Sequence, residues 1–169
     1  MDREAKKLRL VKVDSKNFSA LIDLEVNESQ ELFVADNCFS IAEAYAVTAD
    51  GKYAQPFGIY DGEVPVGFLM IGYDCRDGWE KEIPAFAKNS YAIWRFMIDK
   101  NHQGKGYGRE AMRLALDFIR TFPCGAAEYC WLSYEPHNAV AKKLYQSFGF
   151  EERPEYYEEG DEMPAVLKL

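Results

Sequence analysis

The sequence predicts one α/β domain built on a mixed sheet. Strand and helix patterns fill the first half, a glycine-rich turn at 103–108 joins a strand to a helix, and strand and helix patterns then alternate to the C-terminus. This order fits neither a TIM barrel nor a Rossmann repeat. The chain has 169 residues, 48% of them hydrophobic, which is enough for one core, so we expect a single domain over 1–169.

The part of the chain before the glycine-rich turn is expected to contain four strands and two helices. Its elements are a strand over 8–13, helices over 17–24 and 29–47 with a break near Asn37, and strands over 57–60, 64–71 and 91–98. Asp61-Gly62 is a hairpin turn signal between two of these strands. Residues 91–98 are apolar except for Arg95, which is typical of a strand covered on both faces. Residues 74–89 are polar and irregular.

The second half shows two amphipathic helices. Apolar residues recur at helical spacing at Ala111, Ala115, Phe118, Ile119 and Phe122, before Pro123 and Gly125 end the helix. A strand is expected over 128–132. Asn138 can cap a second helix whose inner face is Ala141, Leu144, Tyr145 and Phe148, with Gly149 following its end. Phe150 and residues 165–169 fit closing strands on either side of an acidic surface loop over 151–162.

Composition excludes several classes of function. The net charge of -8 argues against a nucleic-acid partner and would attract a cationic small molecule. The four cysteines form no CxxC pair and the two histidines form no HExxH motif, so we expect no metal site. The charged N-terminus is not followed by an apolar signal segment, and no apolar run approaches the roughly 20 residues of a membrane span. We expect a cytoplasmic protein with reduced thiols and no membrane partner.

The turn at 103–108 predicts phosphate binding. Its alternating glycines do not form a dinucleotide fingerprint, because Arg109 stands where that motif needs glycine, and a Walker A loop would need Ser or Thr after Gly-Lys. Glycine lets backbone N–H groups approach an anion, and the following helix N-terminus adds positive charge, as do Lys105 and Arg109. An ordinary glycine-rich turn is the alternative, and three alternating glycines after Gln103 favour anion binding.

This turn and a downstream segment resemble two signatures of the GNAT acetyltransferases. Gln103-Gly104-Lys105-Gly106-Tyr107-Gly108 is similar to the family's Gln/Arg-x-x-Gly-x-Gly/Ala motif, and residues 138–150 to N-x-x-A-x-x-L-Y-x-x-x-G-F. The resemblance implies a mostly antiparallel sheet flanked by helices, with two splayed parallel strands, 91–98 and 128–132, that form an acetyl-CoA cleft. It implies an acetyl-CoA-dependent amine N-acetyltransferase. The sequence of 34–45 and 91–98 is most similar to the bacterial diamine and spermine/spermidine acetyltransferases, which implies a polyamine acceptor.

The resemblance also implies roles for individual residues. The backbone of Phe96, Met97 and Ile98 would bond the pantetheine arm as an added strand would. The pyrophosphate would be held at the turn by Gln103, Gly104, Lys105, Gly106, Tyr107, Gly108 and Arg109. Asn138 would contact the cofactor arm. Tyr145 would protonate the departing CoA thiolate, where a tyrosine that only packs in the core is the alternative.

The sequence identifies no general base. An alkylamine with a pKa of about 10.4 is almost wholly protonated at neutral pH, and its deprotonation before attack costs roughly 4–5 kcal/mol of free energy. Some family members carry a glutamate on the strand before the turn, but this strand reads Ile93-Trp94-Arg95-Phe96. Deprotonation could run through water, or through an acid elsewhere.

Several residues are candidates to line the acceptor site. They are Glu25, Glu28 and Glu31 near the first helices, Asp74, Trp79, Glu80 and Glu82 on the irregular segment, and Trp94. An aminoglycoside-like antibiotic or a peptide amine is the alternative acceptor, and a non-catalytic acetyl-CoA-binding module is the alternative from another class. A homodimer is left open.

Overall fold

The computed structural model describes residues 8–76, 78–79 and 82–169. Its strands form one seven-stranded sheet in the order β1-β2-β3-β4-β5-β7-β6. The strands are β1 (Leu8–Lys12), β2 (Tyr53–Asp61), β3 (Val64–Tyr73), β4 (Tyr91–Ile98), β5 (Tyr129–Tyr134), β6 (Glu151–Glu152) and β7 (Met163–Lys168). Every neighbouring pair is antiparallel except β4 and β5, so the sheet is mixed and mostly antiparallel, as expected.

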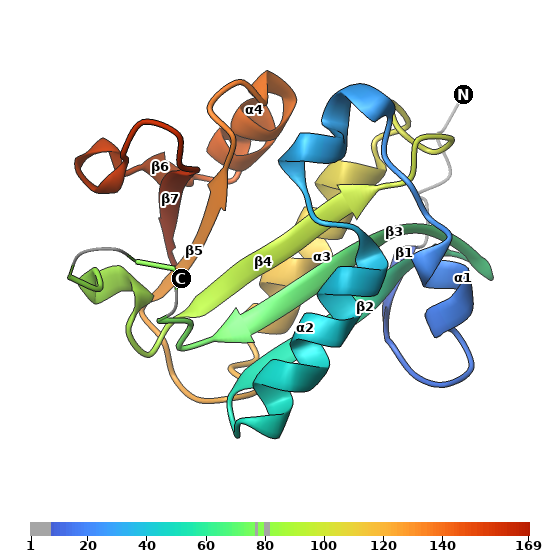
Figure 1. Ribbon diagram of the computed structural model, residues 1–169, viewed down its shortest axis with the longest axis horizontal. Coiled ribbons are helices and arrows are strands. Elements are labelled where there is room, and N and C mark those ends of the chain that lie inside the picture. The colour runs from blue at the N-terminus through green and yellow to red at the C-terminus, as the bar shows by residue number, and fades with distance from the viewer. Residues whose placement is uncertain (1–7, 77, 80–81) are drawn as a thin grey trace.

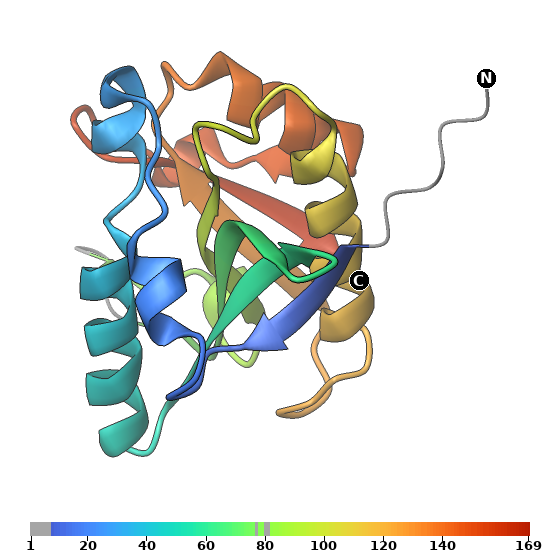
Figure 2. The ribbon, with the colours of Figure 1, turned by 90° about the vertical axis from the view of Figure 1, so that its right-hand side faces the viewer.

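Helices cover both faces of the sheet. They are α1 (Phe18–Ile22), α2 (Asn37–Ala49), α3 (Tyr107–Ile119) and α4 (Ala139–Ser147), with 3-10 turns η1 (Glu28–Phe33), η2 (Ala85–Ala87) and η3 (Pro154–Tyr156). Figure 2 shows α1 and α2 on one face and α3 on the other. The four helices and seven strands thus form a layered α/β fold.

Strands β4 and β5 lie side by side only at their beginnings. Their parallel pairing consists of Tyr91 with Cys130 and Ala92 with Trp131. Beyond these pairs the two strands diverge, as Figure 1 shows, and α4 follows β5 on the far side of the gap. The backbone groups of β4 that face β5 beyond Ala92 therefore have no strand partner, because β5 has turned away.

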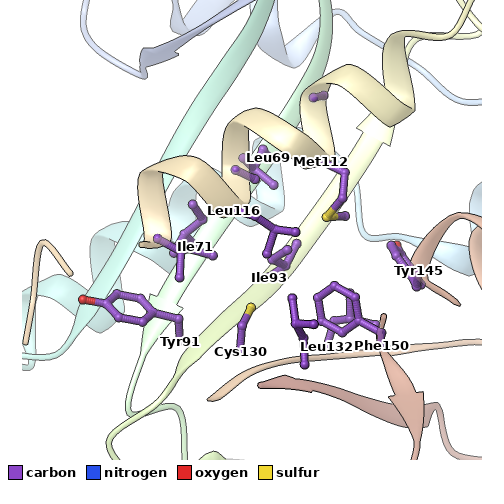
Figure 3. Packing of buried hydrophobic residues seen from close by; sticks show 14 of the residues in the cluster. Leu69, Ile71, Tyr91, Ile93, Met112, Leu116, Cys130, Leu132, Tyr145 and Phe150 are labelled. Carbon is purple, nitrogen blue, oxygen red and sulfur yellow. The ribbon is translucent and has the colours of Figure 1, made fainter. Parts of the chain in front are cut away.

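The main core lies between α3 and the sheet. Met112, Leu116 and Ile119 of α3 pack on Leu69 and Ile71 of β3, together with residues of β4 and β5 (Figure 3). A smaller cluster on the opposite face joins Ala44 of α2 to residues of β2, β3 and β4. Burying both faces of β4 explains its nearly continuous apolar sequence.

One expectation about helices needs correction. Helix α3 ends at Ile119, and Phe122 is 40% exposed with φ 51° rather than on the inner face. Pro123 has no N–H to continue the helix and disfavours a helical conformation at the residue before it, which is consistent with a helix that ends before Phe122. The break expected near Asn37 is present: η1 ends at Phe33 as a 3-10 turn, and α2 starts at Asn37, where the Asp36 side chain accepts a hydrogen bond from the Phe39 N–H (2.7 Å).

Candidate functional site

The divergence of β4 and β5 opens the larger of two hollows, which we call the wide cleft. Its volume is about 800 Å³. It is lined by β4 from Ile93 to Ile98, the turn before α3, the start of α4, and η1 with the residues that follow it. Phe96, Met97 and Ile98 line it as expected, on the strand whose edge lacks a partner. An extended chain carrying amide groups can bond such an edge as an added strand would.

A β-bulge shapes β4 at the point of divergence. Met70 pairs with Arg95 and Ile71 pairs with Ile93, so Trp94 is an extra residue with no partner on β3. A bulge interrupts the alternation of side chains and redirects them. As a result both Trp94 and Arg95 face α2: Trp94 packs on the cluster below that helix, and Arg95 Nη2 lies 2.8 Å from Glu43 Oε2.

The glycine turn presents backbone to the wide cleft. Gly104 and Gly106 have φ values of 72° and 83°, which favour glycine, and a Cβ atom at either residue would meet nothing within 4 Å. The glycines are therefore needed for the backbone conformation, and the space beside them is open to a ligand. Gly106 is the N-cap residue of α3 and has no side chain to accept a hydrogen bond from the first turn. The N–H groups of that turn are therefore available to an anion. Gly104, Gly106 and Gly108 all line the wide cleft.

The side chains of the turn mostly secure the turn itself. Gln103 donates to the Ile98 carbonyl (3.0 Å) and to Gln30 Oε1 (2.8 Å), which ties the turn to β4 and η1. Lys105 Nζ donates to the Asn101 carbonyl (2.8 Å), and Lys105 does not line the wide cleft. The Tyr107 hydroxyl donates to Asp61 Oδ2 (2.5 Å) of the β2–β3 hairpin.

Arg109 is the cation of this turn that faces the wide cleft. Its Nη1 donates to Ser147 Oγ (2.9 Å), and its guanidinium lies 5.2 Å from the centre of the Phe148 ring. These contacts hold the charge near the α3 N-terminus. The turn therefore offers a pyrophosphate N–H groups from the backbone and a fixed positive charge from Arg109.

Tyr145 and Asn138 reach the wide cleft from α4. Asn138 caps the helix, its Oδ1 accepting from the Ala141 N–H (3.1 Å), so its amide nitrogen remains to donate to a ligand. Tyr145 is 8% exposed and lies at the α4 end of the core (Figure 3). Burial, and secondarily the charge of Glu162, raise the pKa of its phenol, so it carries its proton at neutral pH. Within the described chain its hydroxyl has no hydrogen-bond partner.

A second hollow, the acidic pocket, lies at the beginning of β4 and has a volume of about 390 Å³. Of its described lining residues two are basic, Lys52 and Arg95, and six are acidic: Asp74, Glu82, Glu155, Glu158, Asp161 and Glu162. Aromatic rings form its walls, namely Tyr53, Tyr73, Trp79, Trp94, Trp131, Tyr156 and Tyr157. It meets the wide cleft at Ile93–Arg95 of β4, at Ser133 and at Glu162.

The acceptor candidates from the sequence separate into two groups. Asp74, Trp79, Glu82 and Trp94 line the acidic pocket. Glu31 lines only the wide cleft, and Glu25 and Glu28 line neither hollow, so the acidic set near the first helices does not border the pocket. The reason is that η1 packs beside the glycine turn, where Gln30 bonds Gln103. Glu80 lies outside the described residues.

Several lining residues were not predicted from the sequence. Arg95 lies within a strand that reads as interior, Tyr134 lies beyond the strand expected over 128–132, and Glu162 sits in an acidic run that reads as a surface loop, as do Glu155, Glu158 and Asp161. The pairing of Ser133 with Pro164 brings Glu162 to β5, and the Ser133 hydroxyl donates a hydrogen bond to Glu162 Oε2. No spacing along the chain signals this contact.

Other chemistry is limited in the described chain. Burial raises the pKa of the Cys130 and Cys124 thiols, and neither residue lines the two hollows. Among residues 8–76, 78–79 and 82–169, no group of three or more His, Cys, Asp or Glu side chains is placed to hold a metal ion. None of the helices in that part of the chain is long and apolar enough to cross a membrane.

Comparison with known proteins agrees with this geometry. A curated relative, the spermine/spermidine N(1)-acetyltransferase of Bacillus subtilis (strain 168), is 29% identical over 143 residues, which cover 82% of this chain and 84% of the relative. Two solved structures share the fold at 18% identity. A spermidine N-acetyltransferase from Vibrio cholerae, in complex with CoA and spermine, has a TM-score of 0.68, with 97% of this chain and 96% of that chain covered. An aminoglycoside acetyltransferase in complex with coenzyme A has a TM-score of 0.73, with 96% and 95% covered.

A family model covers most of the chain. The model described as the acetyltransferase (GNAT) family matches residues 16–150, a range that contains β4, the glycine turn, β5 and α4. Acetyl-CoA is the co-substrate of these enzymes, and the open edge of β4 and the glycine turn fit its amide arm and its pyrophosphate. The chain belongs to the GNAT family and is an acetyl-CoA-dependent N-acetyltransferase.

Proposed function

We propose that the protein acetylates a linear polyamine such as spermidine or spermine, and that the acceptor lies in the acidic pocket. The observation that carries this proposal is the charge of the pocket lining, where six acidic side chains outnumber two basic ones among the described residues. One of the two cations, Arg95, is paired with Glu43 on α2. A chain of ammonium groups matches such a lining, because each group can approach a different carboxylate.

The aromatic walls suit the same ligand. Trp79 and Trp131 lie with ring centroids 5.2 Å apart, and the Tyr156 ring lies 6.2 Å from that of Trp79. Aromatic faces attract ammonium groups and cover the methylene segments between them. A polyamine alternates these two kinds of group along its length, so a pocket with both carboxylates and rings complements it.

Two further observations support a polyamine. The net charge of -8 favours the approach of cations at long range. A curated relative is named as acting on spermine and spermidine, and a structure with the same fold was solved with spermine. An aminoglycoside is the second candidate, because an aminoglycoside acetyltransferase also shares the fold. It is a larger polycation, so an acidic lining also attracts it, but its many hydroxyl groups would need neutral polar partners in addition.

In this function the remaining site residues take specific roles. The acetyl-CoA pyrophosphate lies at the glycine turn beside Arg109, and the pantetheine amides bond the open edge of Phe96–Ile98. Asn138 donates its free amide N–H to the cofactor arm. Tyr145 protonates the CoA thiolate as it leaves, because its phenol is protonated, reaches the wide cleft and is not engaged by another described residue.

A panel of amines tests the proposal. Thiol release from acetyl-CoA is measured with spermine, spermidine, a monoamine and kanamycin at two salt concentrations. The polyamines should give the highest kcat/KM, and added salt should lower it by screening the pocket charges. A preference for the monoamine or for kanamycin would contradict the polyamine assignment. CoA binding without thiol release for any amine would favour a binding module instead.

A further inference from the structure

Glu162 lies at the junction of the wide cleft and the acidic pocket. Of the described acidic residues that line either hollow, it is the one that lines both. The other five acids of the acidic pocket do not reach the wide cleft, and Glu31 of the wide cleft does not reach the pocket. In the proposed function, an amine in the acidic pocket approaches a cofactor bound along β4 through the junction of the two hollows, and Glu162 lines this junction.

The reaction needs a proton acceptor at this junction. A primary alkylamine with a pKa of about 10.4 is neutral in only about one molecule in 2,500 at pH 7. The protonated nitrogen has no lone pair and cannot attack a carbonyl carbon. Strand β4 offers no acid, since Ile93, Trp94 and Arg95 form its part of the junction.

We propose that Glu162 is the general base that takes the proton from the acceptor ammonium group. This inference rests on the proposed function in one respect, the entry of the amine through the acidic pocket. It does not depend on which amine is the natural acceptor. It assigns a catalytic role to a residue of the loop before β7.

The surroundings of Glu162 suit a base. The Ser133 hydroxyl donates to Oε2 and orients the carboxylate, which leaves Oε1 for a ligand N–H. The side chain is exposed, so a ligand in either hollow can reach it. No Lys or Arg of the described chain forms an ion pair with Glu162, and the one cation at the junction, Arg95, is held 2.8 Å from Glu43 Oε2. The carboxylate is therefore available to a cationic substrate.

The protons balance with Tyr145 as the acid. Glu162 takes one proton from the ammonium group and later releases it to solvent. The freed lone pair forms the C–N bond, and the C–S bond then breaks. Tyr145 gives its proton to the CoA sulfur and regains one from the nitrogen, which loses its second proton as the amide forms. The sum is an acetylated amine, CoA thiol and one proton released.

The test compares Glu162→Gln with wild type across pH, using the amine that the wild type acetylates best. We expect kcat to fall about 100-fold or more at pH 7. We also expect kcat/KM of the variant to keep rising tenfold per pH unit toward the pKa of the amine, because only the free amine reacts, while wild type levels off at lower pH. Unchanged CoA binding by calorimetry establishes that the variant is folded.

Asp161→Asn is the matched control, because Asp161 is the neighbouring acid and lines only the acidic pocket. It removes the same charge and should raise KM at low salt while the wild-type pH profile persists. A Glu162→Gln variant with wild-type kcat, or with a lower kcat and an unchanged pH profile, would overturn the proposal. If the wild type prefers an amine other than a polyamine, the polyamine assignment fails, and the pH profiles with the preferred amine still decide the role of Glu162.

Discussion

The rings of Tyr134 and Tyr145 lie 5.4 Å apart at the α4 end of the wide cleft, but their hydroxyl groups differ. The Tyr134 hydroxyl donates a hydrogen bond to Glu152, which is also 2.9 Å from Lys142 Nζ. The Tyr145 hydroxyl has no such partner in the described chain. Three buried tyrosines of the described chain line this cleft, and the hydroxyl groups of Tyr107 and Tyr134 both donate to carboxylates. Tyr145 is the one of the three whose proton is not committed to a carboxylate.

Tyr145→Phe should lower kcat about 100-fold or more, with a small change in the apparent KM for acetyl-CoA. The phenyl ring keeps the packing on Phe150 and Tyr134, so the fold should persist. Steady-state kinetics and thermal unfolding measure both effects. Tyr134→Phe is the control and should retain most of kcat. Wild-type kcat in Tyr145→Phe would leave Tyr145 as a packing residue.

Gly106→Glu should abolish most CoA binding, because a side chain and a negative charge would enter the space where the pyrophosphate is expected. Gly51→Glu is a matched control: Gly51 has φ 76° and open space around it, but lies at the turn after α2. Both variants carry similar backbone strain, so only Gly106→Glu should lose affinity in calorimetric titration. Equal CoA affinity in the two folded variants would contradict the assignment of the turn.

The hydrogen bonds of the Asp99 carboxylate should make a pH-dependent contribution to the stability of the fold. It is 5% exposed and accepts hydrogen bonds from the N–H groups of Glu25 (3.1 Å) and Asn101 (3.0 Å), and it lies 3.1 Å from His102 Nδ1. Burial by itself would raise the pKa of this carboxyl, but these donors outweigh it and lower the pKa. The carboxylate therefore stabilises the fold above its unfolded pKa of about 3.9.

Asp99→Asn should lower the free energy of unfolding by about 1.5–3 kcal/mol at pH 7, the range for hydrogen bonds to a charged group. The difference from wild type should shrink as the pH falls below about 4, because the carboxyl becomes protonated in both states. Denaturant unfolding at several pH values measures this. The control Asp23→Asn, at an exposed position with no side-chain hydrogen bond in the described chain, should change stability by less than about 0.5 kcal/mol. A pH-independent difference for Asp99→Asn would refute the linkage.

Local patterns predicted much of the fold and several of the residues that line the wide cleft. The strand 91–98 and the cap at Asn138 match the structure residue by residue, because alternation, capping and glycine turns act over a few neighbouring positions. The apolar periodicity misled at Phe122, which lies beyond the end of α3 and has a left-handed backbone conformation. The lining of the acidic pocket was predicted only in part, since Asp74, Trp79 and Trp94 line it and Glu28 does not.

The sequence by itself determined the strand–turn–helix with its glycines and the tyrosine on the inner face of the last helix, since each depends on residues within one or two turns of chain. Tertiary structure alone decided how β4 and β5 part after Ala92, how the bulge at Trp94 turns Arg95 toward Glu43, and how Glu162 reaches Ser133. These features depend on strand register between segments far apart in sequence. Register is set by the packing of the whole sheet, and side-chain periodicity within a segment does not encode which distant residue it will face.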